Sequence, residues 1–170
     1  GLIKPHLEYA LPIWGESRTI FKLSKLNKRL IRTVYNKGKT AHAEPLLKQS
    51  RELQVEDLFK TKSLSLLQKI KQKLGPTTLQ EFFTWNPPSS RRAHLAKIPN
   101  SDRITARTPA VNLTRTWNRY YEGTNQDSSL TEAKPKYFSK EIKKHFIEKY
   151  YEKCTEKHCY SCKRNLPQTE

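Results

Sequence analysis

Apolar residues recur with the period of an α-helix along most of the chain, most clearly between residues 18 and 35. With about 100° of rotation per residue, the apolar positions of this segment fall within a wedge of about 80°, and Leu26 lies at its margin. The positions in the wedge are Ile20, Leu23, Leu30, Ile31 and Val34. Ser17 is a candidate N-cap, and Asn36 and Gly38 are residue types that end a helix in a left-handed turn. The pattern predicts an amphipathic helix over residues 18–35.

Further helices are predicted on both sides of this segment. They cover residues 2–14, 54–74, 110–121 and 135–153, with a turn or two over residues 44–50. Pro5 and Pro12 predict that the first of these helices is kinked or broken. Gly75 and Pro76 are expected to end the second. The chain is therefore expected to be mainly α-helical.

Residues 91–108 show no convincing helical or strand period. They interleave Arg, Lys, Pro and single aliphatic residues, which is typical of an extended arm or a short hairpin. We therefore expect three consecutive domains. These are a small helical bundle over residues 1–86, a basic irregular arm with a short helix over residues 87–121, and a C-terminal helix with a Cys/His tail over residues 122–170.

The composition limits the classes of protein to which the chain can belong. Of its 170 residues, 33 are Lys or Arg and 16 are Asp or Glu, which gives a formal net charge of +17. This charge is well beyond the magnitude of about 2–8 that keeps a small domain soluble, so it predicts a polyanionic partner. Only 35% of the residues are hydrophobic, which predicts a thin core. No apolar run approaches the roughly 18 residues of a membrane span, so no membrane partner is expected.

The chain contains no Met, even at position 1, which suggests a piece of a longer polypeptide. Its first residues lack the apolar region of a signal peptide, so nothing points to secretion. Its three Cys are an odd number and lie close together, between Cys154 and Cys162. This arrangement favours a metal site or free thiols in a reducing compartment over a disulfide framework.

The basic residues of the predicted 18–35 helix share one face. Steps of three and four residues centre them about 160° from the apolar wedge. They are Arg18, Lys22, Lys25, Arg29 and Arg32, and we call this set the basic stripe. No acidic residue occurs between Ser17 and Ala43, so the stripe lacks the pairs of opposite charge that stabilise solvated helices. The pattern favours contact with the phosphates of a nucleic acid, and the alternative is a solvated face.

A second basic region lies further along the chain. Its candidate nucleic-acid-binding residues are Arg91, Arg92, Lys97, Arg103, Arg107 and Arg115. His94, Trp117 and Tyr120 are aromatic residues of the same region that could stack on bases or sugars. The alternative for the region is a loop held by Arg–carboxylate pairs. Trp117 itself fits the core better than a stacking surface, because it shares a helical pattern with Val111 and Leu113.

Cysteine and histidine residues gather near the C-terminus. Cys159 and Cys162 have the Cys-x2-Cys spacing of a zinc ligand pair, and Cys154 could supply a third thiolate. For the fourth ligand, His158 directly precedes Cys159, which is an awkward geometry for two ligands of one ion, and His145 lies nine residues before Cys154, about 13.5 Å away along a continuous helix. The candidate Zn²⁺ ligands are therefore Cys154, His158, Cys159 and Cys162, and the alternative is a tail with free thiols.

The sequence offers no residue pattern typical of an independent enzyme. Asp57, Asp102 and Asp127 are isolated from one another, so no pair of carboxylates suggests a two-metal site. No glycine-rich phosphate loop and no Ser-His-Asp pattern is present. We expect the chain not to be an enzyme on its own.

Residues 2–15 resemble a segment of a known family. Their sequence is Leu-Ile-Lys-Pro-His-Leu-Glu-Tyr-Ala-Leu-Pro-Ile-Trp-Gly. It is similar to the segment that follows the palm in reverse transcriptases of LINE-type (non-LTR) retrotransposons, where a helix with a Pro-His-Leu-x-Tyr core and a terminal Trp-Gly precedes a basic helix. Residues 41–47 and 53–60 are similar to the run between that family's thumb helices, so the resemblance covers about residues 2–75. Residues 108–118, which end in Trp-Asn, resemble a later segment of the family.

The resemblance implies the thumb and the C-terminal segment of a polyprotein that copies RNA into DNA at a nicked target. The catalytic aspartates of the family lie in the palm, upstream of residue 1, and its endonuclease lies further upstream. The thumb would hold the template–primer duplex through Lys22, Lys25, Arg29 and Arg32. The C-terminal segment would bind template RNA or target DNA, largely by shape and phosphate contacts.

The same resemblance implies partners and a location. The partners are RNA, an RNA–DNA duplex or target DNA, together with the palm domain of the same polyprotein. The location is intracellular, in a cytoplasmic ribonucleoprotein and in the nucleus. A C-terminal Cys/His cluster is typical of the family, although the Cys spacing here departs from the family's usual pattern.

An interpretation from another function class remains open. Residues 2–14 and the predicted helix over residues 54–74 could dock a protein partner, with the basic charge serving only solubility. The chain would then be a protein-interaction or scaffold module.

Overall fold

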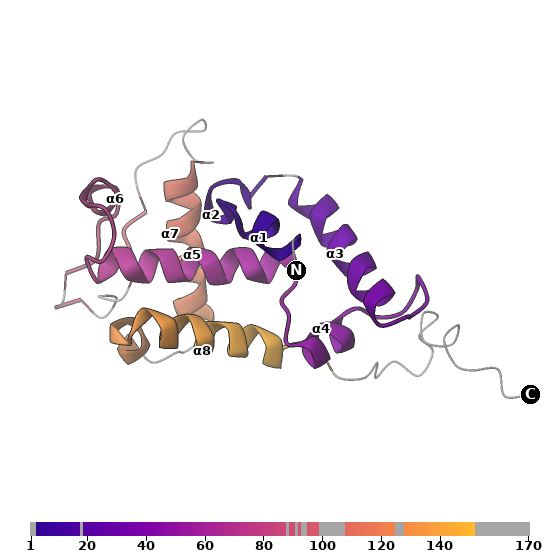
Figure 1. Cartoon of the computed structure of the whole chain (residues 1–170). Coiled ribbons are helices and arrows are strands. Elements are labelled where there is room, and N and C mark those ends of the chain that lie inside the picture. Colours follow the sequence, from indigo (N-terminus) through magenta and orange to yellow (C-terminus); the bar gives the residue numbers. More distant parts are fainter. Residues whose placement is uncertain are drawn as a thin grey trace, which may run out of the picture. The chain divides into compact units, whose positions relative to one another are not determined.

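The structure is a computed structural model that describes residues 3–17, 19–87, 89–90, 92, 95–98, 108–124 and 128–151. These residues are mainly α-helical, which confirms the expected fold class (Figure 1). The chain divides into two compact units. Unit 1 comprises Gly1–Glu16 and Phe59–Ile142, and unit 2 comprises Ser17–Leu58 and Lys143–Glu170. The three consecutive domains expected over residues 1–86, 87–121 and 122–170 stay a prediction.

Unit 1 contains most of the helices, and two helices are shared between the units. The elements of unit 1 are α1 (Ile3–Glu8), α2 (Leu11–Trp14), α6 (Thr77–Glu81), α7 (Pro109–Thr124) and the 3-10 helix η2 (Ser128–Glu132). Those of unit 2 are α3 (Ile20–Val34) and α4 (Glu44–Ser50). The boundary between the units falls within α5 (Val55–Lys71) and α8 (Pro135–Glu148). No helix in the described part of the chain is long and apolar enough to cross a bilayer.

The predicted break in the N-terminal helix is confirmed. Helix α1 ends at Glu8, and α2 begins at Leu11 with Pro12 in its first turn. Between them Ala10 adopts a left-handed conformation with φ of 47°. A proline has no N–H to donate and its ring clashes with the carbonyl four residues earlier, so an unbroken helix cannot pass through Pro12.

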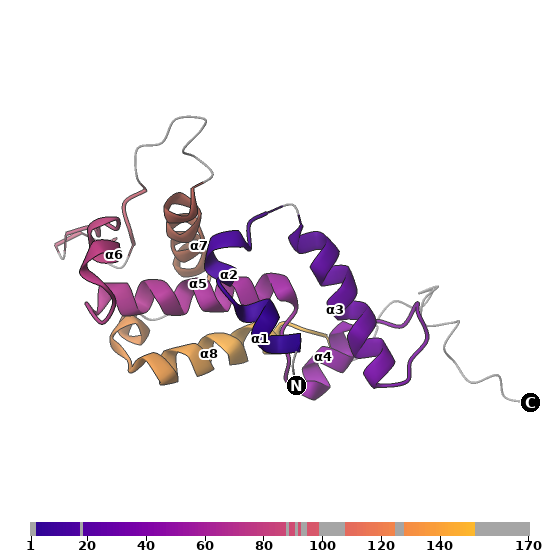
Figure 2. The same cartoon turned by 45° about the horizontal axis from the view of Figure 1, so that its top comes forward.

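Helix α5 lies at the centre of unit 1. The part of α8 in this unit runs beside it, and α7 crosses it (Figures 1 and 2). Leu64 and Leu67 of α5, Trp117 of α7 and Phe138 of α8 are all fully buried. The buried side-chain amide of Gln68 donates to the backbone carbonyls of Thr131 and Ala133, at 3.3 and 2.6 Å. These bonds hold the segment before α8 against α5.

Trp117 belongs to the core, which decides between the two alternatives for this residue. Its ring lies 4.8 Å from that of Tyr121, 5.4 Å from that of Trp85 and 6.3 Å from that of Phe138, between centroids. Lys71 packs on the same cluster, with its Nζ 5.0 Å from the centroid of Trp85. Burial lowers the pKa of Lys71, and the nearby charge of Glu132 opposes this shift.

The start of the second basic region is a short hairpin, one of the two forms that the sequence allowed. Trp85 and Ala96 form an antiparallel bridge, and Lys97 N–H donates to the carbonyl of Thr84 at 2.7 Å. The side-chain amide of Asn118 in α7 both donates to the carbonyl of Ala96 and accepts from its N–H, at 2.8 and 3.0 Å. Asn118 therefore fixes Ala96, on the returning side of the hairpin, to α7.

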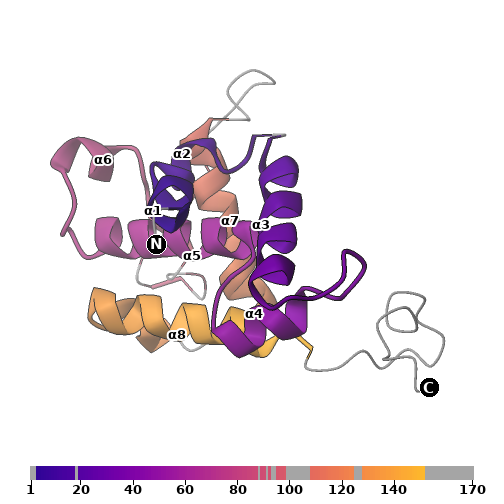
Figure 3. The same ribbon diagram turned by 45° about the vertical axis from the view of Figure 1, so that its right-hand side comes forward.

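In unit 2, α3 packs on α4 (Figure 3). Ile20 and Ile31 of α3 are buried, as are Leu46 and Leu47 of α4. The predicted end of α3 is confirmed, because Asn36 adopts a left-handed conformation with φ of 50°. The N–H of the next residue then donates to the carbonyl of Arg32 at 2.8 Å, as in a Schellman motif.

Three sequence predictions about helix ends are wrong. Ser17 is not the N-cap of α3, because the helix begins at Ile20 and the carbonyl of Thr19 accepts its first bonds. Helix α5 ends at Lys71, before the expected stop at Gly75, because Lys73 takes a left-handed conformation with φ of 58°. Helix α8 ends at Glu148, five residues before the expected end.

The apolar wedge of α3 is only partly buried. Leu30 is 41% exposed and Val34 is 70% exposed. The buried face instead includes Ser24 and the half-buried Asn27, whose side-chain amide donates to the carbonyl of Leu53 at 3.3 Å. Two polar residues, Ser24 and Asn27, thus occupy part of the buried face, where the pattern predicted apolar residues.

The hydroxyl of Tyr150 connects two parts of unit 2. It accepts a hydrogen bond from the N–H of Gln54 at 2.9 Å and donates to Asp57 Oδ2 at 2.7 Å. Lys48 Nζ donates to the backbone carbonyl of Tyr150 at 2.9 Å. Burial and the neighbouring carboxylate of Asp57 raise the pKa of Tyr150 above its usual range, so the hydroxyl keeps its proton. The first turn of α5 is thereby tied to the chain that follows α8.

Replacing Gly15 by alanine is expected to lower the free energy of unfolding by about 1–3 kcal/mol. Gly15 has a helical φ of −65°, so the cost comes from packing and not from the backbone conformation. An added Cβ would clash with the ring of Phe59 and lie 2.6 Å from the carbonyl oxygen of Leu11. Urea denaturation followed by circular dichroism measures the change.

Gly75→Ala is the matched control for this substitution. There an added Cβ meets only Ile70 Cγ1, at an ordinary distance of 3.6 Å. Its stability is expected to stay unchanged or to rise by up to about 1 kcal/mol. Equal effects of the two substitutions would contradict the close packing of Gly15 on Phe59.

Tyr150→Phe is expected to lower the free energy of unfolding by about 1–3 kcal/mol, because it leaves the Gln54 N–H and the Asp57 carboxylate without their shared hydroxyl. Tyr137 is 55% exposed, so Tyr137→Phe is expected to change stability by less than about 0.5 kcal/mol. Thermal unfolding of both variants beside the parent chain measures the difference. A Tyr150→Phe variant as stable as the parent would show that the hydroxyl bridge contributes nothing.

Candidate nucleic-acid interface

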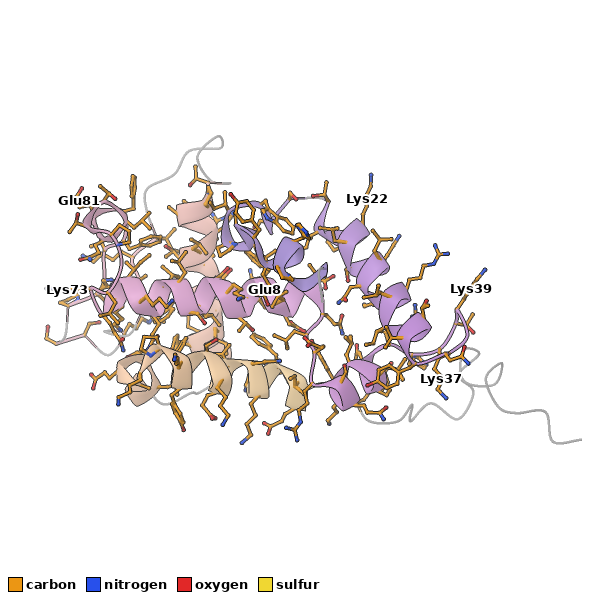
Figure 4. The ribbon with its side chains drawn as sticks, viewed as in Figure 1. Glu8, Lys22, Lys37, Lys39, Lys73 and Glu81 are labelled. Carbon is orange, nitrogen blue, oxygen red and sulfur yellow. The ribbon has the colours of Figure 1, made fainter. Side chains whose placement is uncertain are left out.

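The basic stripe lies on the exposed side of α3. Lys22, Lys25 and Arg29 are exposed, and they lie opposite the buried Ile20 and Ile31. Figure 4 shows the side chain of Lys22 pointing away from the helix. The sequence thus correctly predicts which face of α3 carries the charge.

The other two residues of the stripe differ from these three. Arg32 is half-buried, and its Nε donates to the carbonyl of Ala41, so part of its guanidinium holds the turn after α3. The guanidinium has five N–H donors, so others remain for a ligand. Arg18 lies outside the described residues.

The stripe has no counter-charge within the described part of the chain. No carboxylate there lies within 4.0 Å of Lys22, Lys25 or Arg29. Neighbouring like charges on a helix destabilise it by about 0.2–0.5 kcal/mol per pair. The adjacent pairs of this stripe are Lys22 with Lys25, Lys25 with Arg29, and Arg29 with Arg32, so an approaching polyanion would relieve repulsion as well as form ion pairs.

The hairpin brings part of the second basic region together. Arg92, Arg115 and Arg119 line an open cavity of about 680 Å³ over the hairpin and α7, and the carboxylate residue Glu122 lines it as well. The sequence analysis missed Arg119, although it lies four residues after Arg115 and so shares its face of the helix. One guanidinium group can donate two parallel hydrogen bonds to the oxygens of a phosphate. A cavity lined by arginines is therefore suited to a phosphate of a nucleic acid.

Other predicted residues of this region lie elsewhere. Lys97 is exposed on the hairpin but does not line the cavity. Arg91, His94, Arg103 and Arg107 lie outside the described residues.

The expected stacking of Tyr120 on bases is wrong, because its side chain is buried, whereas the burial of Trp117 confirms its predicted place in the core. Burial and the charge of Glu141 raise the pKa of Tyr120 to about 12. Trp117 and Tyr120 therefore stabilise the fold of unit 1 and are not placed to stack on a base.

The candidate zinc ligands Cys154, His158, Cys159 and Cys162 lie outside the described residues, so this site stays a prediction. Among the residues that the structure does describe, no three His, Cys, Asp or Glu side chains are grouped to hold a metal ion. His145 packs its ring edge-on against Phe146, with centroids 5.6 Å apart, and burial lowers its pKa.

Comparison with models of protein families, with curated proteins and with solved structures found no match. The resemblance of residues 2–75 to LINE-type reverse transcriptases therefore stays a prediction. The basic residues of the candidate interface form two surfaces, one on α3 and one on the hairpin and α7.

Proposed function

We propose that the chain is a non-catalytic, nucleic-acid-binding part of an RNA-directed DNA polymerase that holds template RNA or an RNA–DNA duplex during target-primed reverse transcription. The observation that carries this proposal is the exposed basic stripe of α3, which has no carboxylate partner in the described part of the chain. The order of family-like segments in residues 2–75 supports the assignment to a polymerase.

The geometry of α3 suits a nucleic-acid backbone. Lys22 and Arg29 are seven residues apart, which is about 10 Å along the helix at 1.5 Å per residue. Phosphates of one strand are spaced about 3.4 Å apart along the duplex axis, so the part of the stripe from Lys22 to Arg29 spans about three of them. Contacts of this kind position a duplex without selecting its sequence.

The rest of the proposed setting follows from the resemblance. Catalysis belongs to a palm upstream of residue 1, and the palm is the proposed protein partner. The proposed location is intracellular, in a cytoplasmic ribonucleoprotein and in the nucleus. Zinc bound by the C-terminal cysteines would be a structural part of the same nucleic-acid-binding segment.

A second candidate function is a protein-interaction module, and one observation favours it. Leu26, Leu30 and Val34 form an exposed apolar row beside the basic stripe. Such a row is suited to a protein neighbour, and under the proposed function that neighbour is the palm. Capture of a protein partner that survives nuclease treatment, without any measurable binding of nucleic acid, would support this alternative.

The affinity for an RNA–DNA duplex is expected to fall steeply with salt. Four phosphate contacts predict a slope of about −3 to −4 in a plot of log K against log salt concentration, because each contact releases counterions. Fluorescence anisotropy with a labelled duplex at several salt concentrations measures the slope. A slope near zero would overturn the proposal.

Reversing two charges of the stripe is expected to weaken this binding without unfolding the protein. In Lys25→Glu with Arg29→Glu, loss of two contacts raises Kd at least 15-fold at about 0.15 M salt, and the slope becomes shallower by about 1.4–1.8. Both side chains are exposed, so stability changes little.

Lys37→Glu with Lys39→Glu is the control, since it changes the net charge equally at two exposed lysines in the turn after α3 (Figure 4). This control is expected to raise Kd less than about threefold, because long-range effects between exposed charges are screened by salt. Equal losses of affinity in the two variants would mean that net charge alone matters and that the stripe is only a solvated face.

A further inference from the structure

Unit 1 contains another basic surface, which the sequence analysis did not identify. An open cavity of about 870 Å³ lies along α5 and the start of α8. Four lysines and two serines contribute to its wall, and we call it the lysine groove. They are Lys62, Ser65, Lys69, Lys134, Lys136 and Ser139.

The groove exists because α5 and α8 lie side by side (Figures 1 and 3). Lys62 and Lys69 are seven residues apart, so they lie on one face of α5, about 10 Å apart along its axis. Lys134 and Lys136 stand at the start of α8, where the chain turns into that helix. Residues more than 60 positions apart in the sequence thus form one surface of positive charge.

Most of this charge is uncompensated. Lys62 Nζ forms an ion pair with Glu8 Oε2 at 2.9 Å. Lys69, Lys134 and Lys136 are exposed, and no carboxylate of the described residues lies within 4.0 Å of them. The first turn of α8 contains no acidic residue. The groove therefore carries about three free positive charges beside one neutralised pair.

The lining favours phosphates over bases. None of the described residues that line the groove is aromatic, so it lacks the rings on which proteins stack unpaired bases. Lysine provides a compact, flexible point charge, which binds phosphate without the planar, two-pronged geometry of arginine. The hydroxyl of Ser139 can donate a further hydrogen bond to a phosphate oxygen, whereas the hydroxyl of Ser65 is buried beneath the groove wall.

We propose that the lysine groove binds the phosphate backbone of a nucleic acid, as a site separate from the basic stripe of α3. This proposal rests on the proposed function for the class of ligand, but it assigns binding to different residues in a different unit. The basic stripe belongs to unit 2 and the lysine groove to unit 1, so each unit would have its own site for a nucleic-acid backbone.

The test compares two double variants of the full chain by anisotropy with the labelled RNA–DNA duplex. Lys69→Ala with Lys136→Ala removes two lysines of the groove. Loss of two contacts is expected to raise Kd about 15- to 30-fold at about 0.15 M salt and to make the salt slope shallower by about 1.4–1.8.

The matched control is Lys73→Ala with Lys140→Ala, which removes two exposed lysines of unit 1 that do not line the groove. The control is expected to raise Kd less than about threefold, because these lysines do not contact the duplex and salt screens their long-range effect. Added inorganic phosphate separates a preference for free anions from binding of a backbone. If phosphate at about 10 mM displaces the duplex from the parent chain more than an equal ionic strength of chloride does, and Lys69→Ala with Lys136→Ala abolishes this excess, the groove binds a free anion and the proposal is wrong.

The outcomes separate this proposal from the proposed function. If the groove variant binds like the control while Lys25→Glu with Arg29→Glu loses affinity, the function stands and the groove is not a site. If only the groove variant loses affinity, the groove is a site and the stripe is not. If the parent chain shows no salt-dependent binding of the duplex, both proposals are overturned.

Discussion

Repulsion among like charges is the constraint on which the other features of this chain depend. With 33 basic and 16 acidic residues, the fold has too few carboxylates to pair with its cations. Most of the cations in the described residues lie on exposed faces, while the helices bury their apolar faces. Glu8 neutralises Lys62, but the exposed cations of α3 and of the lysine groove have no such neighbour in the described residues. A bound polyanion would relieve the remaining repulsion. Because the core is thin, this relief would also stabilise the fold, so the low hydrophobic content agrees with the proposed function.

Each unit uses polar contacts where a larger protein would use more apolar packing. In unit 1 the amide of Gln68 holds the segment before α8, and the amide of Asn118 holds the hairpin. In unit 2 the hydroxyl of Tyr150 serves both Gln54 and Asp57. These contacts replace hydrophobic area with directional bonds, so they fix the positions of the helices that carry the basic residues.

Residue types and their spacing correctly predicted several local features of the helices. The break before Leu11 follows from Pro12, the end of α3 follows from Asn36, and the exposed face of α3 follows from the spacing of its lysines. Tertiary contacts decided what these patterns missed. Asn27 is half-buried because it bonds to the carbonyl of Leu53, and this leaves more of the apolar wedge in solvent.

The candidate site divides in the same way between what the sequence predicts and what packing creates. The basic stripe lies within one helix, so its period is visible in the sequence. The cavity beside Arg119 requires the hairpin to fold back on α7, and the lysine groove requires α5 and α8 to pack together. No local sequence pattern predicts either of these packing arrangements. The aromatic residues of α7 have the composition of a stacking platform, yet Trp117 and Tyr120 are buried in the core.

The most direct test of the central claim is the structure of the full chain bound to a short RNA–DNA duplex. The account predicts phosphate oxygens within hydrogen-bonding distance, about 2.7–3.2 Å, of the side-chain nitrogens of Lys22, Lys25 and Arg29. A duplex bound elsewhere, with these three side chains surrounded by solvent, would contradict it.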